Sequence, residues 1–186
     1  MARHEALRKR SPPPTPREQL LRLSPVLPRH RRLHRNGRRW PHARTDYHIN
    51  STPEFFYQHR GAMLLKTVDN STTPPTFQDI PIHEGSLFLL PANTPHCPVR
   101  FADTVGIVVE MPRGEGAEDA MRWYCSGCKG VVWEKRFVCT DLGTQVKEVV
   151  EEFTADEGKR KCGGCGKVAA VRYAEGELVQ PGTFPE

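Results

Sequence analysis

The chain has 186 residues, enough for one domain, or for one domain and a small appendage. Its net charge of +5 comes from residues 1–43, where 12 Lys and Arg face 2 acids; residues 44–186 hold 15 basic and 20 acidic residues. The larger part is therefore mildly acidic, which argues against nucleic-acid binding, and no apolar run reaches the roughly 20 residues of a membrane span. Without the apolar core of a signal peptide near its start, the sequence predicts a cytoplasmic protein.

Residues 1–43 form an atypical segment rich in Arg and Pro, with stretches such as SPPPTP and RHRRLHRNGRRW. Prolines limit regular structure and like charges repel each other. The segment fits a disordered tail, a nucleic-acid-binding arm, a targeting peptide, or an incorrectly assigned start of the gene. We rank the tail and the incorrect gene start first.

A run of short strands is predicted after residue 44. Segments 63–68, 77–82, 86–91 and 105–110 are rich in β-branched or apolar residues, and turn-forming residues separate them. Strands at about this spacing, without helices between them, are typical of an all-β barrel or sandwich. We therefore expect a barrel over residues 44–120.

The last part of the chain, residues 121–186, has a different pattern. Val146, Val149, Val150 and Phe153 follow the i, i+3, i+4, i+7 spacing of one helix face. Two CxxC pairs flank this predicted helix. We expect a C-terminal extension that combines a small helix with a metal-binding knuckle.

Two sequence motifs about 30 residues apart carry the chemistry. The first contains His48, Glu54 and Gly61, and the second contains Gly85, Pro91 and His96. Their spacing resembles the two motifs of the cupin superfamily, G-x5-H-x-H-x3,4-E-x6-G and G-x5-P-x-G-x2-H-x3-N. The resemblance implies a double-stranded β-helix, or jelly-roll, barrel with a metal in its interior.

The departures from the cupin motifs narrow the ligand set. Asn50 stands where the first motif has its second histidine, Asn93 replaces a glycine, and Arg100 replaces the final asparagine. The predicted ligands are His48, Glu54 and His96. Two imidazoles and one carboxylate leave coordination positions open and suit Fe(II). The competing interpretation is ordinary barrel histidines and a surface glutamate, which the joint spacing disfavours.

A closer resemblance extends from about residue 44 to about residue 165. Segments 44–50, 54–58, 98–110 and 122–125 look like the 3-hydroxyanthranilate 3,4-dioxygenase family in its fungal form. This resemblance implies Fe(II)-dependent cleavage of the ring of 3-hydroxyanthranilate by O2. The product, 2-amino-3-carboxymuconate semialdehyde, leads to quinolinate and to NAD. Members of the family form homodimers, so a homodimer is a possible assembly.

Three further residues match the pocket of that family by position. Arg100 follows His96 by four residues, and its guanidinium suits the carboxylate of an aromatic amino acid-type substrate. Glu110 ends an apolar strand and can accept hydrogen bonds from the substrate, which Glu54 also contacts in the family. Arg44, four residues before His48, is expected to bind O2 or stabilise developing negative charge. The alternative is a structural set of salt bridges.

Four cysteines form a second candidate metal site. Cys125, Cys128, Cys162 and Cys165 make two CxxC pairs, and related enzymes carry a rubredoxin-like centre here. Four filled positions indicate a closed, structural site for iron or zinc. The alternative is a disulfide within each pair. Cys97 follows a predicted ligand, and we expect it to be a buried, unreactive thiol; the alternative is a thiol that the nearby iron oxidises.

The family normally begins with a helix and strands that cover one side of the barrel, and residues 1–43 do not show them. Two rival functions are a non-enzymatic cupin and a nucleic-acid-binding protein that combines the basic arm with a zinc ribbon. The first would not need Arg100 and Glu110 beside the metal. The acidic balance of residues 44–186 argues against the second.

Overall fold

The computed structural model describes residues 31–35 and 43–182. Ten strands and two helices make up this part of the chain. The strands are β1 Arg31–Arg35, β2 Tyr47–Ile49, β3 Glu54–Arg60, β4 Met63–Asp69, β5 Thr76–Ile82, β6 Leu87–Leu90, β7 His96–Arg100, β8 Val105–Glu110, β9 Glu118–Tyr124 and β10 Val131–Val138. The helices are α2 Leu142–Ala155 and α3 Glu157–Arg160.

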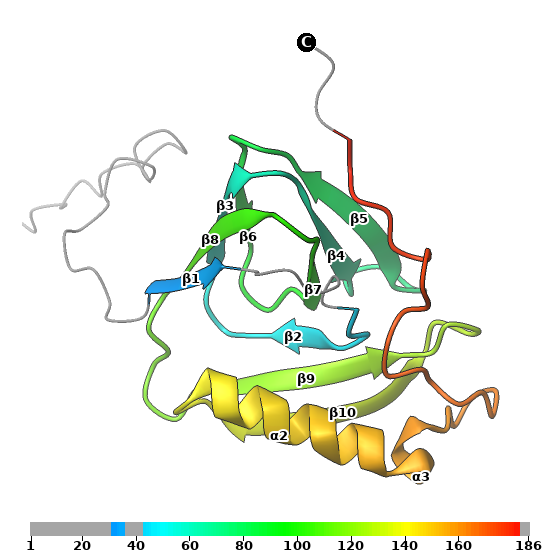
Figure 1. Ribbon diagram of the computed structural model, residues 1–186. Helices are drawn as coiled ribbons and strands as arrows, with labels where there is room; N and C mark the ends of the chain where they lie inside the picture. Colours follow the sequence, from blue (N-terminus) through cyan, green and yellow to red (C-terminus); the bar gives the residue numbers. More distant parts are fainter. Residues whose placement is uncertain (1–30, 36–42, 183–186) are drawn as a thin grey trace, which may run out of the picture.

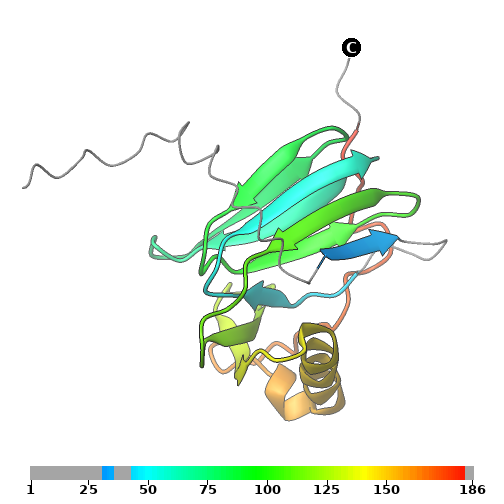
Figure 2. The ribbon, with the colours of Figure 1, turned by 90° about the vertical axis from the view of Figure 1, so that its left-hand side faces the viewer.

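Two antiparallel sheets face each other. One has the strand order β1-β8-β3-β6, and the other has the order β10-β9-β2-β7-β4-β5. Figures 1 and 2 show the strands of the two sheets wrapped around a common interior, with β9, β10 and the helices at one end. This arrangement confirms the expected all-β barrel of the cupin type with a small C-terminal helix.

The interior of the barrel has an apolar half. Phe56, Met63, Leu65, Ile82 and Leu90 are buried together between the sheets. Successive side chains of a strand point to opposite faces, so a strand that lines this core sends every second residue inward. By the same alternation, β3 and β7 also place polar side chains in the interior of the barrel.

The outer face of the six-stranded sheet is also covered. Tyr47, Val68, Cys97, Val99 and Phe101 are buried there. Leu178 packs against this cluster, and the backbone amide of Tyr173 donates to the carbonyl of Ala43. The C-terminal segment, red in Figure 1, thus closes this side of the barrel.

Helix α2 lies across β9 and β10, as Figure 1 shows, and forms a third apolar cluster with them. Asp141 caps its N-terminus by accepting a hydrogen bond from the amide of Gly143. Val149 and Phe153 are buried, and the Phe153 ring stacks on Trp123 with 4.0 Å between the ring centroids. The helix face predicted from the valine spacing is therefore the packed face.

Three residues of the cupin-like motifs lie in turns that require an unusual backbone conformation. Gly61 and Gly85 have φ angles of 67° and 77°, in the region that glycine adopts without steric cost. Asn93, which stands where the second motif has glycine, has φ 61°. Asparagine is among the side chains that tolerate this conformation, so the substitution keeps the turn before His96.

Each of the four predicted strands is present: 63–68 lies in β4, 77–82 in β5, 86–91 contains β6, and 105–110 is β8. The predicted helix lies in α2. Residue 120, the expected end of the barrel part, falls within β9, whose residues pair with β2. The start of the 121–186 segment is thus continuous with the barrel sheet.

The N-terminal prediction for residues 1–43 lies mostly outside the described residues. Within that segment the structure places β1, which pairs with β8 in an antiparallel register. Among the described helices, none is long and apolar enough to cross a membrane.

Candidate metal centre and adjoining cavity

The two sequence motifs meet where β2 lies beside β7. His48 of β2 and His96 of β7 are direct partners in the antiparallel register. Their ring centroids are 5.3 Å apart. Residues 48 positions apart in the sequence therefore present two imidazoles to the same point in the barrel interior.

Glu54 brings a carboxylate to the two imidazoles from the opposite sheet. It is the first residue of β3, and its Oε1 lies 3.2 Å from Nε2 of His96 and 3.8 Å from Nδ1 of His48. One ligand atom from each residue lies within 4.8 Å of the others. Glu54 is buried, which excludes the interpretation as a surface glutamate.

The charged forms of Glu54 and His96 stabilise each other. Burial raises the pKa of the Glu54 carboxyl, but the neighbouring His96 outweighs it, and the net shift is downward. For His96 burial lowers the pKa, but Glu54 outweighs it and the net shift is upward. A buried carboxylate that stabilises positive charge at its neighbour favours a cation at this position.

Asn50 lies beside this group. Its Nδ2 donates a 2.7 Å hydrogen bond to Oε1 of Glu54. Because the side-chain amide of Asn50 donates to the carboxylate of Glu54, it orients that carboxylate.

Further hydrogen bonds fix the two imidazole rings. Nδ1 of His96 lies 3.0 Å from the carbonyl oxygen of Thr94, and Nε2 of His48 lies 2.8 Å from Oδ2 of Asp119. Arg113 donates to both carboxylate oxygens of Asp119. Partners of this kind set the ring orientation and tautomer of histidine ligands in metal sites.

A cavity of about 770 Å³ opens beside the three residues. It is lined by His48, Glu54 and His96, and also by Arg44, Arg100 and Glu110. The structure thus brings all six predicted residues of this site to one cavity. Phe56, Pro98 and Val108 add apolar surface to its wall.

Glu110 and Arg100 differ in their surroundings. Oε2 of Glu110 lies 2.7 Å from Nη1 of Arg113, so this carboxylate is already paired. Arg100 is 6% exposed, and burial lowers the pKa of its guanidinium with no described carboxylate to offset that effect. A buried cation of this kind can bind an anionic group that enters the cavity.

Arg44 occupies the rim of the cavity, with its Nε 3.3 Å from Oδ1 of the buried Asp46. The thiol of Cys97 donates to the backbone carbonyl of Arg44. Burial raises the pKa of this thiol, as expected for an unreactive cysteine.

Sequence reasoning did not find Asp46, Arg113 and Asp119. Asp119 is 71 residues from His48, and an isolated aspartate carries no spacing signal. Arg113 follows Glu110 by three residues, a spacing that implies contact in a helix but not after a strand.

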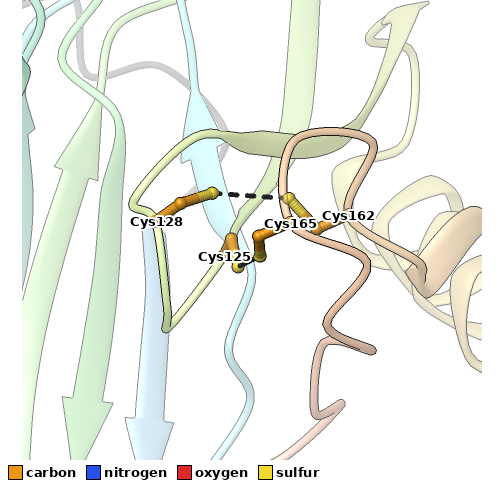
Figure 3. Close-up of side chains that lie close together, drawn as sticks. All are labelled: Cys125, Cys128, Cys162 and Cys165. Carbon is orange, nitrogen blue, oxygen red and sulfur yellow. Dashed lines mark hydrogen bonds between the residues drawn. The ribbon is translucent and has the colours of Figure 1, made fainter.

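The four cysteines converge in a second group, shown in Figure 3. Sγ of Cys125 lies 3.4 Å from Sγ of Cys165, and Sγ of Cys128 lies 3.5 Å from Sγ of Cys162. All four are free thiols, so neither CxxC pair is closed by a disulfide. Sulfur atoms around a tetrahedral metal with bonds of about 2.3 Å would be about 3.8 Å apart.

The two CxxC loops have the same backbone design. In each, the amide of the first cysteine donates to the carbonyl five residues later, and its carbonyl accepts from the amide four residues later. The residue at this fourth position, Lys129 or Gly166, has a positive φ. The two matched loops thus present their four sulfurs to one point, an arrangement that suits a tetrahedral metal ion.

Backbone amides favour the thiolate form of Cys125 and Cys162 in this second group. The amides of Cys128 and Gly127 lower the pKa of Cys125 to about 6, and those of Cys165 and Gly164 lower the pKa of Cys162. The amide of Gly130 also lowers the pKa of Cys128, but the neighbouring sulfurs of Cys162 and Cys125 outweigh it and raise this pKa to about 11. Metals bind cysteine as the thiolate, so the lowered pKa values in these two loops favour binding of a metal cation.

The family model and the similar proteins that match this chain agree on one family. The family model for 3-hydroxyanthranilic acid dioxygenase matches residues 38–154. A protein of Coccidioides immitis (strain RS), "3-hydroxyanthranilate 3,4-dioxygenase", is 77% identical over 146 residues, which cover 78% of this chain and 76% of that protein. "3-Hydroxyanthranilate 3,4-dioxygenase 1" of Aspergillus clavatus is 75% identical over 146 residues, with the same coverage. A relative of the same name as the first, from Aspergillus niger, is 77% identical over 143 residues, 76% of each chain.

Among solved structures, the chain is similar to an oxalate decarboxylase at 17% identity and a TM-score of 0.35. The match covers 75% of this chain and 31% of that one. A mutant of Bacillus subtilis oxalate decarboxylase gives a TM-score of 0.37 at 16% identity, over 83% of this chain and 37% of that one.

Proposed function

The chain belongs to the 3-hydroxyanthranilic acid dioxygenase family, and from this premise we propose that it cleaves the aromatic ring of 3-hydroxyanthranilate with O2. It is a ring-cleaving dioxygenase of the extradiol type. Its product, 2-amino-3-carboxymuconate semialdehyde, leads to quinolinate in the kynurenine route from tryptophan to NAD. One observation supports placing this activity at the site. A single cavity contains His48, Glu54 and His96 together with the buried Arg100.

The donor set suits a ferrous ion. Two imidazoles and one carboxylate, with no thiolate among them, form the ligand set found in non-haem Fe(II) oxygenases. We propose that His48, Glu54 and His96 hold this ion, which would template the reaction between the aromatic substrate and O2.

Arg100 is proposed to bind the carboxylate of the substrate. Its guanidinium is buried on the cavity wall, and a planar guanidinium can meet a carboxylate with two parallel hydrogen bonds. This contact fixes one end of the ring and directs the hydroxyl and amino groups towards Glu54 and the imidazoles. The apolar surfaces of Phe56, Pro98 and Val108 exclude water from the ring.

Glu110 is proposed as the proton acceptor for the substrate's hydroxyl or amino group. It ends β8, and its register partner in β3 is the proposed ligand Glu54. Arg113 holds Oε2 of Glu110 at 2.7 Å and thereby orients the carboxylate at the cavity. A positioned carboxylate can take a proton as the ring is attacked.

Arg44 is proposed to stabilise bound oxygen or negative charge that develops on the substrate. It reaches the cavity from the segment before β2, and Asp46 limits its movement through the 3.3 Å ion pair. A fixed cation at a site of developing negative charge lowers the barrier without reorganisation.

The cysteine group is proposed to hold a structural iron or zinc ion. All four positions are supplied by protein sulfurs, which leaves none for a substrate. We further propose residues 44–120 as the barrel part and 121–186 as the extension that carries this site. Action in the cytoplasm and a homodimer remain predictions from the sequence and the family resemblance.

Turnover after anaerobic reconstitution with Fe(II) tests the function. Addition of 3-hydroxyanthranilate and air should consume O2 and substrate in equal amounts, followed with an oxygen electrode and by chromatography. His48→Ala and His96→Ala should each abolish turnover, because each removes one of three protein ligands. His59→Ala is the matched control, since His59 is exposed on β3 outside the cavity.

A non-enzymatic cupin is the alternative that this experiment decides. Wild-type protein that binds Fe(II) but consumes neither O2 nor 3-hydroxyanthranilate would overturn the proposal. So would turnover that survives in both histidine variants at the level of the His59 control.

A further inference from the structure

Gln58 is a fully buried polar side chain that no proposed step uses. It is 0% exposed, and its Nε2 donates a 3.0 Å hydrogen bond to the carbonyl oxygen of Arg60. This bond fixes the orientation of the amide. Its Oε1 is buried without a hydrogen-bond partner among the described residues. A buried acceptor without a partner is destabilising, so its retention requires an explanation.

Gln58 lies on the inner face of the barrel, in line with the site. Side chains two residues apart on a strand share a face, and Glu54, Phe56 and Gln58 follow one another in this way along β3. On β7 the same rule places Arg100 on the face of His96. Both side chains therefore face the interior, each four residues along its strand from a proposed ligand.

Gly106 brings these two side chains together. It is the register partner of Gln58 in β8. A Cβ atom on Gly106 would lie 2.5 Å from Oε1 of Gln58 and 2.7 Å from Nη1 of Arg100. Since both atoms are this close to one point, they are at most 5.2 Å apart, the sum of the two distances. The missing side chain of Gly106 leaves room for both groups.

A neutral acceptor is the suitable neighbour for this guanidinium. A carboxylate beside Arg100 would neutralise its charge and compete with an incoming anion. An amide oxygen can accept a hydrogen bond from the guanidinium and leave the positive charge available. The chain has glutamine at this position, although carboxylates pair with the other arginines beside the cavity: Asp46 pairs with Arg44, and Glu110 and Asp119 pair with Arg113.

We propose that Gln58 is a positioning residue: its Oε1 accepts a hydrogen bond from the Arg100 guanidinium when this side chain binds the substrate carboxylate, in the space that Gly106 leaves open. This inference rests on the proposed function, because Arg100 binds a carboxylate only if the substrate carries one. Gln58 then determines the preference for a carboxylated ring over the same ring without the carboxylate.

Gln58→Met tests this role, because methionine has a similar length and shape but no amide oxygen. The Fe(II)-loaded protein is titrated without oxygen with 3-hydroxyanthranilate and with 2-aminophenol, which keeps the hydroxyl and amino groups and lacks the carboxylate. The variant should bind 3-hydroxyanthranilate about 10-fold more weakly, the effect of one hydrogen bond to a charged group. Its affinity for 2-aminophenol should stay within about 2-fold of wild type, because that ligand does not need Arg100.

Two more variants separate positioning from a general loss of stability. Gln58→Glu keeps the size and an acceptor but places a carboxylate beside Arg100, so its preference for the carboxylated ligand should fall further. Thr104→Val removes a buried hydrogen bond to the carbonyl of Phe101 outside the cavity and should leave the preference unchanged. If Gln58→Met does not fold, Gln58→Glu carries the same comparison.

Equal weakening of both ligands by the Gln58 variants, or no change in either, would overturn this inference while wild-type turnover leaves the proposed function standing. Absence of turnover in the wild-type protein would instead overturn the proposed function.

Discussion

His48 has a different neighbour at each ring nitrogen. Nδ1 faces the carboxylate of Glu54, and Nε2 pairs with Asp119 at 2.8 Å. Burial raises the pKa of Asp119, but hydrogen bonds from His48 and Arg113 outweigh it, and the net shift is downward. Asp119 is therefore a carboxylate that fixes the ring, and Arg113 links it to Glu110 through a second ion pair. This one arginine therefore connects the His48–Asp119 pair to Glu110.

Asp119→Asn should weaken Fe(II) binding by about 10- to 100-fold, the usual effect of losing the carboxylate behind a histidine ligand. Asparagine keeps the shape but removes the charge that holds the His48 ring and its tautomer. Anaerobic competition with a chelator of known affinity measures the change. Glu118→Gln is the control, since it alters the same charge one residue away, at an exposed position. An affinity equal to that of the control would show that Asp119 does not support His48.

The strands differ in how clearly the sequence predicts them. β4 and β8 carry the β-branched and apolar residues that the barrel core requires, and the sequence indicates both. β3, with the sequence EFFYQHR, and β7, with HCPVR, send Glu54, Gln58, His96 and Arg100 inward. A strand whose buried face lines a polar cavity loses the hydrophobic alternation on which strand prediction depends. The polar residues that line the cavity therefore hide β3 and β7 in the sequence pattern.

The CxxC loops were predictable as a pair, because their spacing alone indicates four sulfurs around one ion. The sequence does not show that Cys125 directly follows β9, the strand that also carries Asp119. The second loop follows α2 and α3, so the site ties the end of a barrel strand to the C-terminal helices. We expect a metal here to stabilise this junction.

Cys165→Ser should remove about one metal ion per chain and lower the melting temperature, because a closed four-thiolate site needs all of its ligands. Elemental analysis of the purified protein measures the stoichiometry and identifies the metal as iron or zinc. Ser126→Ala changes a non-cysteine residue in the other loop and should keep the wild-type stoichiometry. A variant that retains the full metal content would contradict a four-cysteine site.

At the scale of the whole molecule, the two candidate metal centres have different surroundings. One lies inside the barrel, beside a cavity and with three protein ligands, whereas the other has four sulfurs from two loops at the end that carries α2 and α3. The residues of both groups were predictable from the spacing within local motifs, and the structure brings each group together. Gln58, Arg113 and Asp119 were not, because their partners come from other strands and only the fold brings them together.

The central claim is that His48, Glu54 and His96 bind one iron ion in the barrel. Crystals of the Fe(II)-reconstituted protein, with diffraction data on both sides of the iron absorption edge, test it directly. The anomalous difference map should contain a peak bonded to all three side chains, and this peak should vanish below the edge. A map of fully reconstituted protein with no iron peak between these residues, or with iron at the four cysteines alone, would contradict the account.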